Sequence, residues 1–239
     1  MREAVRLAGI TLPSLWPLWL AGAGLNVASA FWVKANVGPD MMLTTEQLLA
    51  YAIVVSVPSG VLIGVCLRAM LGVGRDRWRM DRGIVGYTLI GMALALAELW
   101  PAGLLADAAE AGIADPYLRQ WGMYLAGAVV WFALLYPASR LLVWPIRHLM
   151  GDTSATPAES WRIMRGAAIP YALALVLLST PFYVADLFAW ERFFYFQSYL
   201  GMAIACVVDA AWDAVWCGLA AAAYRVRVLD SERLAEVFG

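Results

Sequence analysis

Three carboxylic acids interrupt apolar stretches of the sequence and are its strongest candidates for chemistry. Asp209 and Asp213 stand four residues apart in the stretch 197–224, so an α-helix would present them on one face. Glu98 lies in the stretch 83–106. An acid at the centre of a membrane-spanning helix costs about 2.5–3.5 kcal/mol to insert, so these side chains should face a bundle interior, a cavity or a partner. They indicate either a proton or cation site or protonated acids whose hydrogen bonds hold helices together.

Two cysteines extend the acidic face but do not make it a metal site. Cys206 and Cys217 continue the helical spacing of Asp209 and Asp213. A single helix face rarely supplies a full coordination shell, and no histidine lies nearby. The sequence therefore predicts no metal and no other cofactor.

The same inventory excludes several enzyme classes. His148 is the only histidine, so the chain cannot supply bis-histidine haem ligation, an H-E-x-x-H zinc motif or a Ser–His protease pair inside a membrane. It also lacks the G-x-x-x-x-G-K-[ST] loop of nucleotide hydrolases. We expect no enzymatic activity, and an enzyme acting on lipids is the third alternative because no nucleophile–base pair is visible.

The elements that must position these acids follow from hydropathy. Hydrophobic residues make up 63% of the 239-residue chain and charged residues 15%, whereas soluble domains are about 25% charged. Spanning a bilayer takes about 20 mostly apolar residues, and six stretches qualify. The sequence therefore predicts an all-α, polytopic membrane protein with a single domain, residues 1–239, and six transmembrane helices at 10–33, 46–70, 83–106, 120–144, 167–189 and 197–224.

The distribution of basic residues orients the six predicted helices. With the N-terminus inside, fourteen of the 17 basic residues fall on the inner side, and only Lys34, Arg119 and Arg192 fall outside. Lys and Arg concentrate in cytoplasmic loops. We therefore expect both ends of the chain in the cytoplasm, a bacterial-type inner membrane as the location, and no binding to nucleic acid.

The first apolar stretch has a second interpretation. Arg2 and Arg6 precede it, and Ala28-Ser29-Ala30 resembles a signal-peptidase site. Because the stretch 10–33 is long enough to cross a bilayer, we interpret it as an uncleaved first transmembrane helix.

Short motifs suggest an internal repeat. The pattern W-R-x-x-R-G occurs at 78–83 and at 161–166, where it opens the third and fifth predicted helices. The residues 67–72 and 146–151 are alike at the ends of the second and fourth helices. The chain can thus be read as three repeated two-helix hairpins in one orientation, although any cytoplasmic helix start attracts Trp and Arg.

The arginines of the repeated motif are candidates for lipid contact. Arg79, Arg82, Arg162 and Arg165 would lie at head-group depth. Each basic residue there gains about 1 kcal/mol from an anionic membrane surface. They indicate either this general attraction or the binding of a specific phospholipid head group.

A proline in the second predicted helix admits two interpretations. Pro58-Ser59-Gly60 is either an ordinary kink, which membrane helices tolerate, or a bend that lines a cavity, as in transporter binding sites.

The layout resembles a known family of small bacterial six-helix proteins. Residues 160–166 fit the S-W-x-x-x-R-G pattern, and the alanine run 220–223 is followed by Tyr224-Arg225. Both features are similar to the membrane domain of glycerophosphoryl diester phosphodiesterases. The resemblance spans the whole chain and implies the six-helix fold. It carries over no enzymatic residue, because the catalytic domain of that family is absent.

Together these observations predict a non-enzymatic membrane protein. We expect an accessory or scaffolding subunit, or a factor in lipid or envelope homeostasis, with the lipid bilayer, a larger membrane complex or further copies of itself as partners. The alternative is a small transporter or channel component that uses Asp209, Asp213 and Glu98 as a proton or cation site. An accessory subunit should leave a small-residue face free for a partner, for which Gly218 and the run 220–223 are the candidates.

Overall fold

The chain folds into an elongated bundle of helices. The structure, a computed structural model, describes residues 6, 15–36, 45–73, 75–193 and 199–230, and these contain helices and no strand. This confirms the predicted all-α class. The elements in chain order are α2 (Trp16–Asn36), α3 (Thr45–Met70), the 3₁₀ helix η1 (Arg75–Trp78), α4 (Arg82–Gly112), α5 (Pro116–Leu141), α6 (Val143–Leu149), α7 (Pro157–Ile163), α8 (Ala168–Phe193), α9 (Tyr199–Tyr224) and the π-helix η2 (Arg225–Leu229).

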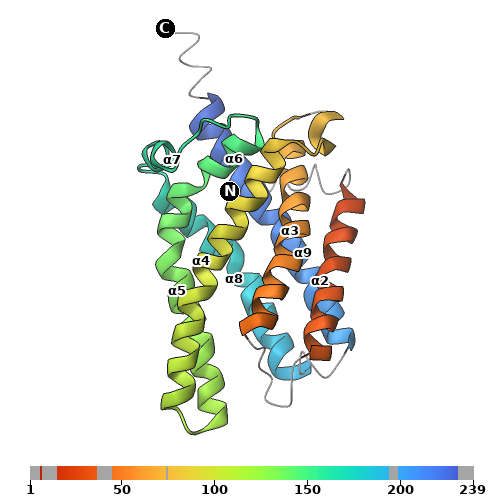
Figure 1. The fold of residues 1–239 in the computed structure, drawn as a ribbon, viewed down its shortest axis with the longest axis vertical. Helices are drawn as coiled ribbons and strands as arrows, with labels where there is room; N and C mark the ends of the chain where they lie inside the picture. Colours follow the sequence, from red (N-terminus) through yellow and green to blue (C-terminus); the bar gives the residue numbers. More distant parts are fainter. Residues whose placement is uncertain (1–5, 7–14, 37–44, 74, 194–198, 231–239) are drawn as a thin grey trace.

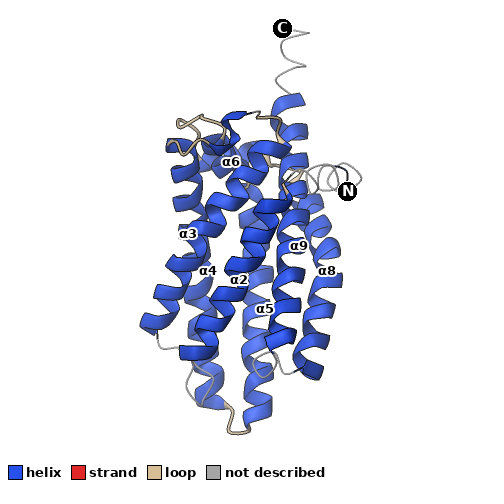
Figure 2. Ribbon diagram, turned by 90° about the vertical axis from the view of Figure 1, so that its right-hand side faces the viewer, coloured by secondary structure: helices blue, strands red, loops and turns tan. Residues whose placement is uncertain are grey.

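The six long helices of the described residues run along the length of the bundle (Figures 1 and 2). They pack in the cyclic order α2, α3, α4, α5, α8 and α9, and α9 closes the ring against α2 while also contacting α3. The short elements η1, α6, α7 and η2 gather at one end of the bundle (Figure 1). We call this end the arginine-rich end, because most of the described arginines lie on it.

One long helix corresponds to each predicted segment, with ends that differ by several residues. The helix expected at 83–106 continues to Gly112 as α4. The residues left between the fourth and fifth predicted helices, 145–166, include a further helix, α7. Residues 10–14 of the first predicted segment lie outside the described residues, and Ala28-Ser29-Ala30 lies within the continuous helix α2.

The fourth predicted helix is broken near its end. The axis bends by 48° between residues 128–141 and α6. Pro145 has no N–H to donate to the carbonyl of Leu141, so the helical ladder fails there. The buried Ser160 hydroxyl accepts from Trp144 N (3.1 Å) and donates to the carbonyl of Arg140 (2.9 Å). It thereby replaces the bond that these two backbone groups would share in a straight helix.

The fifth predicted helix, 167–189, corresponds to α8, and the short helix α7 precedes it across an 85° bend. Thr156 and Glu159 form a capping box at the start of α7, with Pro157 in its first turn. Gly166 then adopts φ +80°, a backbone conformation that favours glycine. The motif at 161–166 therefore spans a sharp turn, whereas Arg82 and Gly83 of its counterpart are the first residues of the single helix α4.

The other half of the predicted repeat has one geometry at both sites. Gly72 and Gly151 have φ +88° and +98°. After α3, Val73 N bonds to the carbonyl of Arg68 (2.9 Å), and after α6, Asp152 N bonds to that of Arg147 (3.0 Å). Both helices thus end in a Schellman motif with a left-handed glycine.

Apolar side chains divide into a core near the arginine-rich end and stripes that face outward. Within the described residues, the core joins the ends of α3, α8 and α9 to α4, α6 and α7, and contains Leu67, Ile84, Leu149 and Met164. On α8, Ile169, Leu173 and Leu177 are each about 60% exposed. Comparable outward stripes occur on α5, with Leu125, Val129 and Phe132, and on α9, with Leu200, Ile204 and Val207.

Within the described residues, no single helix has both the length and the hydropathy needed to cross a membrane. Two bent pairs do by length and composition, namely 128–141 with α6 and α7 with 168–182.

Candidate functional site

A buried arginine organises the arginine-rich end. Arg68, in the last turn of α3, is 4% exposed. Its guanidinium donates to Asp81 Oδ1 (2.7 Å), to the carbonyl of Leu149 (2.8 and 3.0 Å) and to that of Arg79 (2.8 Å). Leu149 is the last residue of α6, whose final carbonyls have no partner within the helix. One side chain therefore neutralises Asp81 and closes the end of a neighbouring helix.

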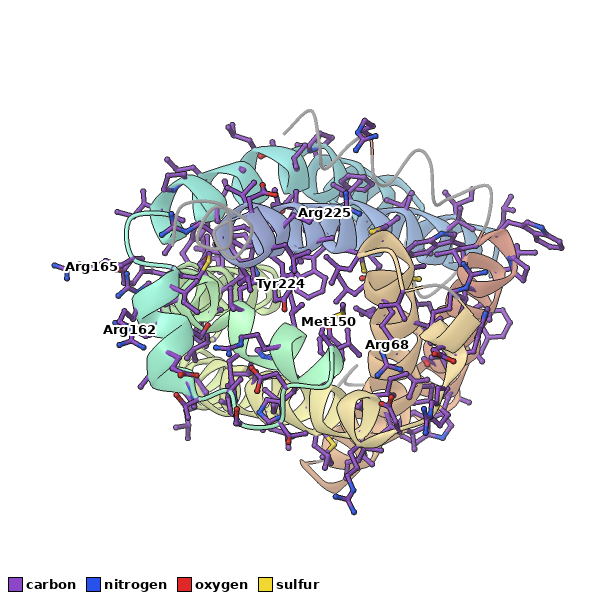
Figure 3. The ribbon with its side chains drawn as sticks, turned by 90° about the horizontal axis from the view of Figure 1, so that it is seen from above. Arg68, Met150, Arg162, Arg165, Tyr224 and Arg225 are labelled. Atoms are coloured by element: carbon purple, nitrogen blue, oxygen red, sulfur yellow. The ribbon has the colours of Figure 1, made fainter. Side chains whose placement is uncertain are left out.

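The π-helix η2 supplies two further bonds of this kind. Arg225 donates to the carbonyl of Met70, the last residue of α3 (2.5 Å). Arg227 donates to the carbonyl of Ile163 at the end of α7 (2.6 Å) and to that of Arg165 (3.0 Å). Figure 3 shows Arg225 and Arg68 at this end of the bundle. A cation at a helix C-terminus also interacts favourably with the helix dipole, so these arginines are structural ties between elements.

Two carboxylates at this end are held in their ionised form. Partial burial would by itself raise the pKa of Asp81, but hydrogen bonds from Arg68 and from Ile84 N, together with the Arg68 charge, lower it below the usual aspartate value. The pKa of Asp152 is lowered mainly by the hydrogen bond from the Ser154 hydroxyl and also by the charge of Arg147, although burial opposes them. Both acids form ion pairs with these arginines.

The four arginines predicted to contact lipid head groups are all exposed. Arg79, Arg82, Arg162 and Arg165 form no side-chain hydrogen bond or ion pair with any residue that the structure describes. In Figure 3, Arg162 and Arg165 point away from the bundle on the side of α7. By contrast, the guanidinium groups of Arg68, Arg225 and Arg227 donate hydrogen bonds to other residues of the chain.

Arg140 belongs to neither group. It lies at the end of α5 and is 7% exposed. Its guanidinium carbon lies 4.8 Å from the centre of the Trp161 ring and 5.9 Å from that of Tyr136.

The predicted acidic site is described for Asp213 alone. Asp213 lines a cavity of about 20 Å³ between α2, α3 and α9, which also receives Asn26, Ser59 and Trp19. This volume admits about one water molecule. The Nε1 atom of Trp19 is buried without a hydrogen-bond partner in the described structure. Glu98 lies in α4 and Asp209 in α9, but both side chains fall outside the described residues.

One sequence-based expectation is wrong. Gly218, Ala220 and Ala221 are buried in the core of this chain rather than left free for a partner. Their small size lets α9 pack closely against its neighbours, so the helix carries its small residues inward.

Several residues of the arginine-rich end were missed by the sequence reasoning. Ser160 and Trp161 are part of the motif S-W-x-x-x-R-G, but nothing in the motif says that they contact Arg140. The capping box formed by Thr156 and Glu159 could have predicted the start of α7 from the sequence.

Among the described residues, no group of three or more His, Cys, Asp and Glu side chains is placed to hold a metal ion.

Comparison of the chain with protein-family models, with curated proteins and with solved structures finds no match.

Proposed function

We propose that this chain is an integral protein of a bacterial-type inner membrane, with six transmembrane helices and both ends in the cytoplasm. It acts without catalysis, as a lipid- or envelope-homeostasis factor whose arginine-rich end engages anionic phospholipid head groups. The observation that carries this proposal is the outward direction of the apolar stripes. The likeness to the membrane domain of glycerophosphoryl diester phosphodiesterases remains part of the proposal.

The stripes argue for a nonpolar surrounding. Leu177 and Leu200 are 63% and 71% exposed, and they belong to runs at helical spacing. Scattered apolar residues are normal on water-soluble proteins. Continuous stripes on several helices are not, because contiguous exposed apolar area marks an interaction with protein or membrane. In a bilayer, lipid acyl chains would cover these faces, so their apolar side chains would not be exposed to water.

The charges support one orientation of the bundle. The four exposed arginines lie at the arginine-rich end, and they project outward without partners among the described residues. In the proposed orientation this end meets the anionic inner leaflet, where each arginine gains about 1 kcal/mol. Lys and Arg also concentrate on the cytoplasmic side of membrane proteins, which favours the same orientation.

Membrane integration and orientation can be tested together. Membranes from cells that express the full chain are washed with alkaline carbonate, and reporter domains are fused at the two ends and within 113–115. The proposal expects the chain to stay in the membrane, both terminal reporters to be cytoplasmic and the internal reporter to be periplasmic. Release by carbonate, or a terminal reporter outside the cell membrane, would contradict it.

The head-group contact has its own test. The variant with Arg79, Arg82, Arg162 and Arg165 replaced by Gln is compared with the wild type in nanodiscs that contain phosphatidylglycerol and phosphatidylcholine. Enrichment of phosphatidylglycerol around the protein should fall severalfold in the variant, and the wild-type enrichment should weaken with added salt. Equal enrichment in both proteins would remove this part of the proposal.

The cavity at Asp213 favours a second function, proton or cation transport. Carboxylate, amide and hydroxyl oxygens and an indole N–H from α2, α3 and α9 reach one small space. An acid beside a cavity within a membrane bundle is a default candidate for such a site. The purified chain is reconstituted in vesicles, and pH-driven and Na⁺-driven fluxes are measured for wild type and Asp213→Asn. A flux lost in the variant supports transport, and the absence of any wild-type flux argues against it.

A further inference from the structure

Arg140 is a buried cation without a carboxylate. The residue is 7% exposed, and no ion pair or side-chain hydrogen bond links its guanidinium to a described residue. Its Nε atom is fully buried and has no hydrogen-bond partner in the described structure. A buried polar group left unpaired costs about 1–3 kcal/mol, and more when it is charged. Among the described residues, the contacts that compensate are those with the Trp161 and Tyr136 rings.

Arg68 shows how the same bundle treats a buried guanidinium that serves only the fold. At 4% exposure, Arg68 has a carboxylate and two carbonyl oxygens around it. Arg140 is buried to nearly the same extent, at the same end of the bundle. The difference indicates that the partner of Arg140 is not a residue of the described chain.

Two aromatic side chains flank Arg140. Trp161 lies over the guanidinium, and Tyr136 meets Trp161 edge to face with their ring centres 6.2 Å apart. Both rings are themselves about 40% exposed. Unlike Nε, the terminal nitrogens of Arg140 are not among the fully buried atoms that lack a partner. These nitrogens are therefore the donors that an anion beside the rings would meet, since a planar guanidinium donates two parallel hydrogen bonds.

The surface that leads to Arg140 suits a lipid. On α5, Val129, Phe132 and Tyr136 face outward at helical spacing, and Arg140 is the next position on this stripe. From Val129 to Arg140 the helix rises about 16 Å at 1.5 Å per residue. This is about half the 30 Å thickness of a bilayer's hydrocarbon core. An acyl chain lying on this stripe would bring its phosphate to the level of Arg140.

We propose that Arg140, under the Trp161 ring, binds the phosphodiester of an anionic phospholipid whose acyl chain lies along the α5 stripe. This inference rests on the proposed membrane location, and it adds one specific site to the general attraction of the exposed arginines. Arg162, adjacent to Trp161 and exposed, adds positive charge at the mouth of the site. Ser160 fixes the position of Trp161, because its hydroxyl bonds to the carbonyl of Arg140 itself.

The test uses the full-length chain in mild detergent and native mass spectrometry. Phosphatidylglycerol is titrated against wild type, Arg140→Met and Arg140→Lys, with phosphatidylcholine as the zwitterionic lipid. Loss of a charge-assisted hydrogen bond should weaken phosphatidylglycerol binding about tenfold in Arg140→Met. Arg140→Lys keeps the charge but loses the fork, so it should show a smaller loss. Ser139→Ala, a buried change next in sequence, is the control that should bind as wild type does.

The outcomes separate this site from the exposed arginines and from the membrane location. Phosphatidylglycerol binding that depends on Arg140 should persist at high salt in the wild type. It should also persist in the protein in which the four exposed arginines are replaced by Gln. Phosphatidylglycerol binding that is unchanged in a folded Arg140→Met protein would overturn the proposal, as would displacement of the lipid by millimolar inorganic phosphate. If Arg140→Met does not fold, the Arg140→Lys titration decides, and wild-type affinity in that variant would equally overturn it. Carbonate extraction of each variant reports membrane integration independently.

Discussion

At the scale of single residues, Gly83 has the least room for a side chain among the described glycines. A Cβ atom there would lie 2.7 Å from the carbonyl oxygen of His148 and 3.0 Å from both Leu149 O and Arg68 Nη2. Since backbone atoms cannot move aside, Gly83→Ala should lower stability by about 2–4 kcal/mol by separating α4 from α6 and disturbing Arg68. Thermal unfolding in detergent measures this loss.

Gly86 provides the matched control, one helical turn further along α4. A Cβ atom on Gly86 would meet His148 at 3.8 Å or more, which is ordinary contact. Because alanine favours a helix by about 1 kcal/mol over glycine, Gly86→Ala should leave stability unchanged or raise it. An equal loss of stability in both variants would mean that the short distances around Gly83 do not explain the effect of Gly83→Ala.

Asp81 should give the arginine-rich end a dependence on pH. Because its pKa is lower in the folded chain than the usual value of about 3.9, the ion pair with Arg68 stabilises the fold above that pH. The contribution is lost as the pH falls through the folded-state pKa. Asp81→Asn should therefore be less stable than wild type at neutral pH, by about 1–2 kcal/mol since the Asp81 side chain is 37% exposed.

The decisive observation is the change of this difference with pH. The melting temperatures of wild type and Asp81→Asn should converge below about pH 4. Asp76→Asn, an exposed change in the neighbouring η1, should follow the wild-type profile. A constant gap between wild type and Asp81→Asn down to pH 3 would show that Asp81 acts through shape alone.

The sequence predicted where the arginines lie better than it predicted what each of them does. The sequence placed many arginines at one end, and the structure agrees for those described. Sequence spacing could not separate Arg68, which bonds to a carbonyl 81 residues away, from Arg79, which is exposed. That distinction depends on which helix end meets which side chain after folding.

At the scale of elements, the bend between α5 and α6 depends on one hydroxyl. Ser160 occupies the gap in the helical ladder by bonding to both Trp144 N and the Arg140 carbonyl. Ser160→Ala leaves both groups buried without their partner, so it should cost about 1–3 kcal/mol. It should also speed hydrogen exchange at the amide of Trp144, which mass spectrometry can resolve.

Ser139→Ala tests whether that effect is specific. The Ser139 hydroxyl donates to the carbonyl of Leu135 in the same helix (2.6 Å), and the residue is 2% exposed. Its loss removes only a second bond on an acceptor that the helix already uses, so stability should change by less than about 1 kcal/mol. If both serine variants lose the same stability, the bend does not need Ser160.

Hydropathy located the helices but not their breaks. Apolar stretches of about 20 residues predicted one straight helix each, since a spanning length is all that such a pattern measures. The bend after Leu141 comes from Pro145 together with a serine 15 positions later, and no local rule joins them. The turn between α7 and α8 had local signals in Thr156, Glu159 and Gly166. By contrast, the likeness of 67–72 and 146–151 was visible in the sequence, and Gly72 and Gly151 both adopt a left-handed conformation.

At the scale of the whole molecule, the order of the helices explains why α9 is rich in small residues. It contacts α2, α3 and α8. Ala214, Cys217 and Ala221 are each buried completely. A helix with neighbours on several sides needs small side chains for close approach. The sequence showed these residues but could not show that the partners were helices of the same chain.

The outward stripes lead to a prediction that depends on the surrounding solvent. Leu177 is 63% exposed on α8, and in water Leu177→Lys would be an ordinary surface change worth less than about 0.5 kcal/mol. In a bilayer, a lysine near the middle of a spanning helix costs about 2.5–3.5 kcal/mol. If the proposed location is right, the variant should show a reduced carbonate-resistant fraction and a lower melting temperature in lipid nanodiscs. Ala158→Lys, an exposed change on α7 at the arginine-rich end, should insert as wild type does. Full insertion of Leu177→Lys with unchanged stability would mean that α8 turns this face toward water, and the membrane proposal would lose the observation that carries it.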